Sequence, residues 1–98
     1  MSIKPVPMGE LLGGFADYLT PADLIAARLL AKISSTIVKK RIDLNLTQKE
    51  FAEFLGVTQG MVSKWESEDY NFTIEALANI CEKLDLKLDI VMRSNIYQ

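Results

Sequence analysis

Apolar residues recur at helical spacing in several stretches of the chain, and four of these stretches follow a threonine. A threonine side chain accepts hydrogen bonds from the backbone N–H groups that the first turn of a helix leaves without partners. Pro21 and Glu50 strengthen two of these starts, because proline suits the first helical position and glutamate completes a capping box. We therefore expect a first helix from Pro21 to about Asp43 and four helix starts in all, after Thr20, Thr47, Thr58 and Thr73.

The second and third of these helices are short and separated by a tight turn. Ala52 is followed four residues later by Gly56, six further on by Val62 and three further on by Trp65. A small residue lets two helices cross closely, and glycine can take the left-handed backbone conformation that ends a helix. Val62 and Trp65 then lie on one inner face. This spacing is typical of a helix-turn-helix, and the alternative is a bundle that merely contains short helices.

The N-terminal stretch has a weaker pattern. Residues 1–7 contain two prolines and little periodicity, which indicates an extended lead-in. Apolar residues recur at helical spacing from Met8 to Leu19, although Gly13 and Gly14 disfavour a helix by about 1 kcal/mol each relative to alanine. We expect a short, imperfect helix here. It either packs on the first long helix or serves as an arm that binds a partner.

The C-terminal stretch changes to a two-residue period. Leu86, Leu88 and Ile90 alternate with charged residues, as in a half-buried strand. A lone strand leaves backbone groups unpaired, so we expect pairing with the same strand of a second copy across a two-fold axis. A final helical turn with a frayed tail is the alternative. The expected organisation is an extension over residues 1–19, a helix-turn-helix domain with a dimerisation strand over 20–92, and a tail over 93–98.

Composition restricts the classes of function. The 98 residues fit one globular domain, and neither a membrane-spanning run nor a signal peptide is evident, so we expect a cytoplasmic protein with no membrane partner. There is no histidine, and Cys81 is the only cysteine, in phase with the apolar residues of the last helix, so a core position is favoured over a redox role. We expect no metal site, no cofactor and no enzymatic activity, since the sequence also lacks paired carboxylates and a phosphate-binding loop.

The net charge of −2 is unevenly distributed along the chain. Six basic and three acidic residues lie between Lys32 and Lys64, whereas two basic and seven acidic residues lie between Trp65 and Met92. This asymmetry fits a mildly basic binding face and an acidic opposite end.

The motif over residues 47–66 resembles the Xre/Cro-type helix-turn-helix of lambdoid phage repressors, Cro proteins and their bacterial relatives. Residues 33–56 are similar to the first two helices of such a repressor and residues 73–84 to its fourth, so that about half of the chain is covered. The resemblance implies an all-α, lambda-repressor-like bundle of four to five helices, to which the sequence adds a C-terminal β-strand that pairs in a dimer. It also implies a homodimer that binds an inverted-repeat operator in double-stranded DNA, with helix 59–66 in the major groove.

The layout FADYLTPAD before a long helix is similar to that of HigA-type antitoxins, which repress their own operon and neutralise a toxin partner. A phage-derived or free-standing regulator is the alternative within the same class.

The resemblance also implies roles for single residues. Gln48 would contact a phosphate, Gln59 could read adenine, and Lys64 could donate to guanine. Arg41 matches a position that pairs with Glu66 in the repressors and also reaches toward phosphate. Dimerisation would involve Leu86, Leu88 and Ile90, and the expected DNA-binding residues are Arg41, Gln48, Thr58, Gln59, Gly60, Met61, Ser63, Lys64 and Asn71.

Three features of the sequence oppose DNA binding. The net charge is negative, Gly60 replaces a side chain that relatives use for readout, and Glu68 and Asp69 lie where the loop of the family often approaches phosphate. The alternative function is therefore a protein-interaction module that keeps the helix-turn-helix fold without binding DNA.

Overall fold

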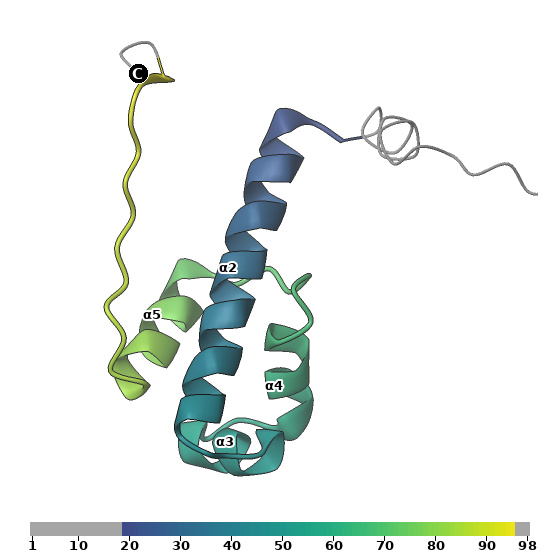
Figure 1. The fold of residues 1–98 in the computed structure, drawn as a ribbon, viewed down its shortest axis with the longest axis vertical. Helices are drawn as coiled ribbons and strands as arrows, with labels where there is room; N and C mark the ends of the chain where they lie inside the picture. Colours follow the sequence, from purple (N-terminus) through teal and green to yellow (C-terminus); the bar gives the residue numbers. More distant parts are fainter. Residues whose placement is uncertain (1–18, 96–98) are drawn as a thin grey trace, which may run out of the picture.

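The computed structural model describes residues 19–95, and its helices form a small bundle (Figure 1). The short helix expected between Met8 and Leu19 and the extended lead-in before it therefore lie almost wholly outside the described residues, as does the end of the tail. The described part is all-helical, as expected for a lambda-repressor-like bundle, and its four helices are α2 (Pro21–Asp43), α3 (Gln48–Leu55), α4 (Gln59–Trp65) and α5 (Ile74–Lys83).

All four predicted helix starts are confirmed. Each threonine cap has an extended backbone, and its hydroxyl accepts a hydrogen bond from the backbone N–H three residues later. In α3 the bond is reciprocal, because the Thr47 N–H donates to the Glu50 carboxylate at 2.9 Å. The same reciprocal bond forms at α2, where Asp23 takes the place of the glutamate.

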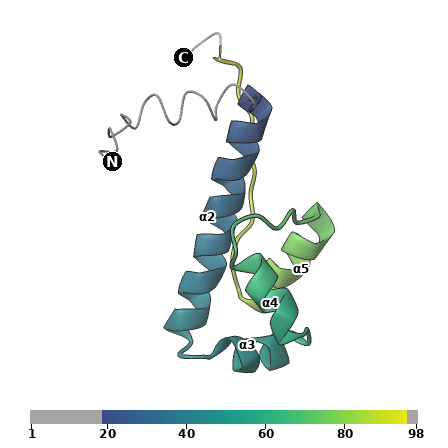
Figure 2. The ribbon, with the colours of Figure 1, turned by 90° about the vertical axis from the view of Figure 1, so that its right-hand side faces the viewer.

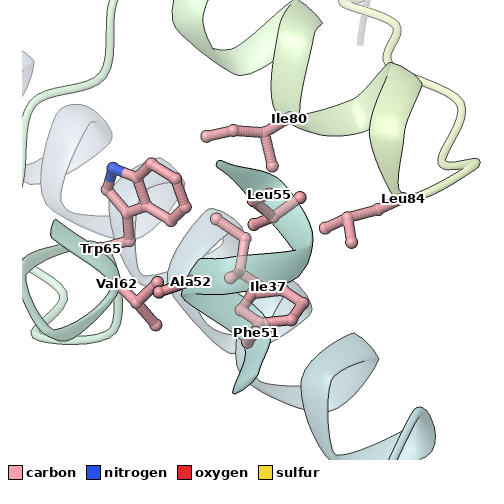
Figure 3. Packing of buried hydrophobic residues seen from close by; sticks show 8 residues of the cluster. All are labelled: Ile37, Phe51, Ala52, Leu55, Val62, Trp65, Ile80 and Leu84. Carbon is pink, nitrogen blue, oxygen red and sulfur yellow. The ribbon is translucent and has the colours of Figure 1, made fainter. Parts of the chain in front are cut away.

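The hydrophobic core lies where α3, α4 and α5 meet the C-terminal half of α2. Figure 3 shows the buried hydrophobic side chains, which come from the four helices and from Leu84, the residue that follows α5. Phe51 and Val62 have no exposed surface, and Ala52 is small where α3 and α4 pack together, as the motif spacing requires. The buried hydrophobic residues are Ile37, Phe51, Ala52, Leu55, Val62, Trp65, Ile80 and Leu84.

Only the C-terminal half of α2 packs against the other helices. Its buried residues are Ser34 and Ile37, and the N-terminal half projects past the bundle (Figures 1 and 2). Residues 20–29 are all exposed, including Leu24 and Ile25. No helix in the described range is long and apolar enough to span a membrane.

The C-terminal segment leaves α5 and runs along one side of α2, while α4 lies on the other side (Figure 1). Residues 86–94 form no strand in the single described chain, so the predicted strand is not shown. The physical reason is that a strand is defined by its hydrogen bonds to a neighbouring strand, and the described part of this chain contains no neighbouring strand. Pairing with a second copy stays a prediction.

Cys81 differs from its expected position in the core. It is half-buried and lines a groove between α2 and α5, whereas the core contribution of α5 comes from Ile80. Burial raises the pKa of the Cys81 thiol. A raised pKa disfavours the thiolate, which is the nucleophilic form of cysteine.

Candidate nucleic-acid interface

The turn between α3 and α4 is fixed by its backbone. Gly56 has φ 73°, a left-handed conformation that glycine adopts without a Cβ clash. Its N–H donates to the Glu53 carbonyl, and the Val57 N–H donates to the Ala52 carbonyl at 2.9 Å, which together form a Schellman motif. Lys83 from α5 adds a third bond, since its Nζ donates to the Leu55 carbonyl oxygen at 2.6 Å. The angle between α3 and α4 is therefore set by local bonds and by a tie to α5.

Helix α4 has one buried face and one exposed face. Val62 and Trp65 are buried, and Trp65 packs in a tilted arrangement near Phe72 with ring centroids 6.4 Å apart. Met61 is half-buried and packs against the core, so it is less available for a base contact than its neighbours. The expected DNA-binding residues in and before α4 that are exposed are Thr58, Gln59, Gly60, Ser63 and Lys64.

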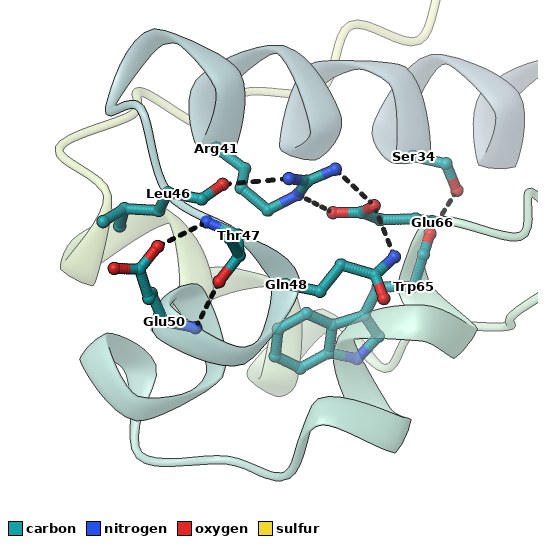
Figure 4. A network of polar contacts seen from close by, with 8 residues as sticks. All are labelled: Ser34, Arg41, Leu46, Thr47, Gln48, Glu50, Trp65 and Glu66. Atoms are coloured by element: carbon teal, nitrogen blue, oxygen red, sulfur yellow. Dashed lines mark hydrogen bonds and ion pairs between the residues drawn. The ribbon is translucent and has the colours of Figure 1, made fainter.

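An ion pair between Arg41 and Glu66 fixes the end of α4 to α2 (Figure 4). Arg41 Nε donates to Glu66 Oε2 at 2.7 Å and Nη2 donates to Oε1 at 3.1 Å, so the pair is bidentate. The two side chains are 18% and 8% exposed. Arg41 Nη1 also donates to the Leu46 carbonyl at 2.9 Å. A guanidinium has five N–H groups, and those not used in these bonds are left for a further acceptor.

Gln48 joins the same network. Its Nε2 donates to Glu66 Oε1 at 3.0 Å (Figure 4). A carboxylate can only accept hydrogen bonds, so Glu66 determines which end of the Gln48 amide faces inward. Arg41, Gln48 and Glu66 therefore bring together α2, the start of α3 and the end of α4 at one point.

Ser34 makes a contact that the sequence analysis missed. It is 1% exposed, and its hydroxyl donates to the Trp65 carbonyl oxygen at 2.6 Å, one turn of α2 away from Ile37 (Figure 4). A carbonyl in the last turn of a helix has no partner within the helix, so Ser34 satisfies a group that burial would otherwise penalise. The only available signal was its position three residues before a core isoleucine, which also suits a small apolar residue.

The loop after α4 holds the acidic residues that oppose DNA binding. Glu68 has a left-handed backbone with φ 71° and lines a shallow hollow beside Ser35 and Lys39 of α2. Asp69 accepts a hydrogen bond from the Ser67 hydroxyl at 2.5 Å. Asn71 is exposed in the same loop. Glu68 therefore lies beside α2, and the Asp69 carboxylate is hydrogen-bonded within the loop.

Fold and interface together define a DNA-binding regulator with a helix-turn-helix. A family model described as helix-turn-helix matches residues 37–91, which is more than half of the chain. The chain belongs to this Xre/Cro-like helix-turn-helix family, as its motif spacing predicts. The family is one of DNA-binding domains and not of enzymes. Neither the curated proteins nor the solved structures gave a significant match to the chain.

Proposed function

We propose that this protein is a transcriptional repressor that binds an inverted-repeat operator in double-stranded DNA as a homodimer and reads its sequence through residues 59–66. The observation that carries the proposal is the exposed face of α4, which presents Gln59, Ser63 and Lys64. The opposite face of α4 is buried, and its end is held by Ser34 and Arg41. A recognition helix must be held rigidly if its side chains are to discriminate between bases.

The side chains on this face have the chemistry of base readout. A glutamine can form a bidentate pair with adenine, a lysine can donate to guanine, and each good bidentate pair discriminates by about 1–3 kcal/mol. Gln48 and Arg41 would position the protein by contacts to phosphate, and Asn71 could add another from the loop. Gln48 has a second amide N–H, and Arg41 has N–H groups beyond those that bond to Glu66 and Leu46, so the network of Figure 4 is compatible with both contacts.

Selection of binding sites from random duplex DNA tests this proposal. It should be done near physiological salt, because the affinity of proteins for DNA falls steeply as salt increases. We expect enrichment of an inverted repeat with half-sites about one helical turn apart. Lys64→Ala should abolish the enrichment, whereas Arg28→Ala, on the projecting half of α2, should leave it unchanged. A folded protein that enriches no sequence would contradict the proposal and favour a protein-interaction module.

A second candidate function, that of an antitoxin, has support from the projecting half of α2. Leu24 and Ile25 are each 52% exposed there, on the part of α2 that projects past the bundle. Apolar side chains at such a place suit contact with a protein partner. If the product of a neighbouring gene arrests growth, this chain should relieve the arrest and Ile25→Asp should not. Relief by the variant as well would remove α2 from the partner interface.

A further inference from the structure

An open apolar groove of about 370 Å³ lies between α2, α5 and the C-terminal segment. Leu29 and Ile33 line it from α2, Ile74 from α5, and Leu88 and Ile90 from the C-terminal segment. These side chains are not packed together: Ile74 is 68% exposed, Ile90 61% and Leu88 41%. Apolar side chains thus face one another across a space that no described residue fills.

The backbone beside the groove also lacks partners. Between Lys87 and Met92 the backbone makes one hydrogen bond, which the Ile90 N–H donates to the neighbouring Asp89 carboxylate. Just before this stretch, the Leu86 N–H donates to the Cys81 carbonyl at 2.8 Å. An extended segment with open N–H and C=O groups is a strand edge ready to pair.

We infer that the groove is closed by a second copy of this chain, whose C-terminal segment pairs antiparallel with this one so that Leu88 lies on the two-fold axis. The inference rests on the homodimer in the proposed function and specifies how that dimer is built. The pairing places Leu86, Leu88 and Ile90 of both copies on one face of a two-stranded ribbon. All three residues line the groove, as do Lys87 and Asp89 between them.

The pattern of apolar and charged residues restricts the register. The axis must pass through a residue and not between two residues. An axis between two residues would place the apolar side chains of one copy opposite the charged side chains of the other, on the same face of the ribbon. With the axis on Leu88, Lys87 lies opposite the partner's Asp89, and Asp89 lies opposite the partner's Lys87. Leu86 then lies opposite the partner's Ile90. Both ion pairs fall on the face of the ribbon opposite the apolar row. Directly opposite charges of unlike sign stabilise antiparallel strands.

Two neighbouring registers place like charges opposite each other. With the axis on Lys87, the Lys87 side chains of the two copies would lie opposite each other, and with the axis on Asp89 the two Asp89 side chains would do so. An axis on Leu86 would pair Asp85 with the partner's Lys87, but it needs an extended chain before Leu86. The structure rules this out, because α5 ends at Lys83 and the next residue is part of the core.

A more distant register, with the axis on Val91, also matches charges, because Asp89 would face the partner's Arg93. It would, however, place the partner's Ser94 opposite Leu88 in the apolar row. The groove also argues against it, since the part of the segment that lines the groove runs from Leu86 to Ile90 and is centred on Leu88. The axis on Leu88 is the register that satisfies both the charges and the groove.

Disulfide cross-linking tests the register directly. In a Cys81→Ser background, Leu88→Cys should form a cross-linked dimer on mild oxidation, because opposite residues have Cα atoms about 4.5–5.5 Å apart, within the range of a disulfide. Ile90→Cys should not cross-link with itself, because the two copies of residue 90 would lie about 14 Å apart along the ribbon. A mixture of Leu86→Cys and Ile90→Cys proteins should give the mixed dimer. Val91→Cys is the matched control for the competing register.

A charge exchange provides a second test. Lys87→Asp alone replaces both ion pairs with like-charge contacts and should raise the dimer dissociation constant about tenfold, measured by sedimentation equilibrium at low salt. The double variant with Lys87→Asp and Asp89→Lys restores opposite charges and should recover most of this loss. A double variant as weak as the single one would overturn the inference. Both side chains are exposed in the single chain, so the variants should retain its helical fold, which circular dichroism checks.

The outcomes separate the dimer from DNA binding, because neither test uses DNA. Cross-linking of Val91→Cys in place of Leu88→Cys would overturn the register. A protein that stays monomeric at the highest soluble concentration would overturn the inference and the homodimer together. Cross-linking through Leu88→Cys in a protein that selects no DNA sequence would support this inference while contradicting the proposed function.

Discussion

Gly60 occupies a position where the fold itself does not require glycine. Its φ is not positive, and a Cβ added to it would meet only the Thr58 hydroxyl, at 3.9 Å. Glycine within a helix is less favourable than alanine by roughly 0.5–1 kcal/mol. This residue therefore destabilises α4, although the fold does not need a glycine here. Gly60 lies on the exposed face of α4 that we propose to enter the major groove, and without a side chain its backbone can approach DNA closely.

Gly60→Ala should therefore act in opposite directions on stability and binding. We expect the free energy of unfolding to increase by about 0.5 kcal/mol, because alanine favours the helix. We expect the affinity for the selected operator to decrease, because the new methyl group separates α4 from the DNA. Urea denaturation and a DNA titration measure the two quantities. An affinity that is unchanged or higher would show that the α4 backbone does not approach DNA at this point.

At the scale of single helices, the starts of α2 and α3 depend on carboxylates. Hydrogen bonds from the Thr47 backbone and then from its side chain lower the pKa of Glu50, and the same bonds from Thr20 lower the pKa of Asp23. A carboxyl group whose pKa is lower in the folded state stabilises the fold above its unfolded pKa, and this contribution is lost as the pH falls through the folded pKa. Both helix starts should therefore weaken in acid.

The pH dependence can be isolated at α3. Glu50→Gln keeps an acceptor for the Thr47 N–H but does not titrate, so the variant should be less stable than the unsubstituted protein at pH 7. This difference in thermal midpoint should shrink as the pH is lowered from 7 toward 3. Glu53→Gln removes a charge from the same helix without a capping bond and serves as the control. A difference for Glu50→Gln that stays constant with pH would contradict the role of its carboxylate.

The elements were predictable from the sequence because their signals are local. A threonine cap and the residue three positions later are enough to place a helix start, and Gly56 marks its end. The contacts that fix these helices to one another were not predictable in the same way. Ser34 donates to a carbonyl 31 residues away, and Lys83 donates to one 28 residues away. Neither residue type indicates which group it will contact. The pairing of Arg41 with Glu66, 25 residues apart, was available only through the family resemblance.

For the whole molecule, the surface proposed for dimerisation and the surface proposed for DNA binding lie on opposite sides of α2. The C-terminal segment with its groove lies on one side and α4 on the other, as Figure 1 shows. A dimer formed on the groove side therefore leaves the exposed face of α4 uncovered in both copies. A single helix contacts only a few base pairs, so binding of a complete operator depends on linking two of them.

Removal of residues 87–98 should therefore separate folding from operator binding. The truncation retains Leu84, which is buried, and Leu86, whose N–H bonds to the Cys81 carbonyl, so the helices should still form. We expect a monomer by sedimentation. Its affinity for the full inverted repeat should be at least about a hundredfold lower, because linkage of two binding modules commonly contributes a factor of 10²–10⁴. Its affinity for an isolated half-site should change little. A truncated protein that still binds the full operator tightly would show that the two α4 helices are linked through another surface, such as the projecting half of α2 with its exposed Leu24 and Ile25.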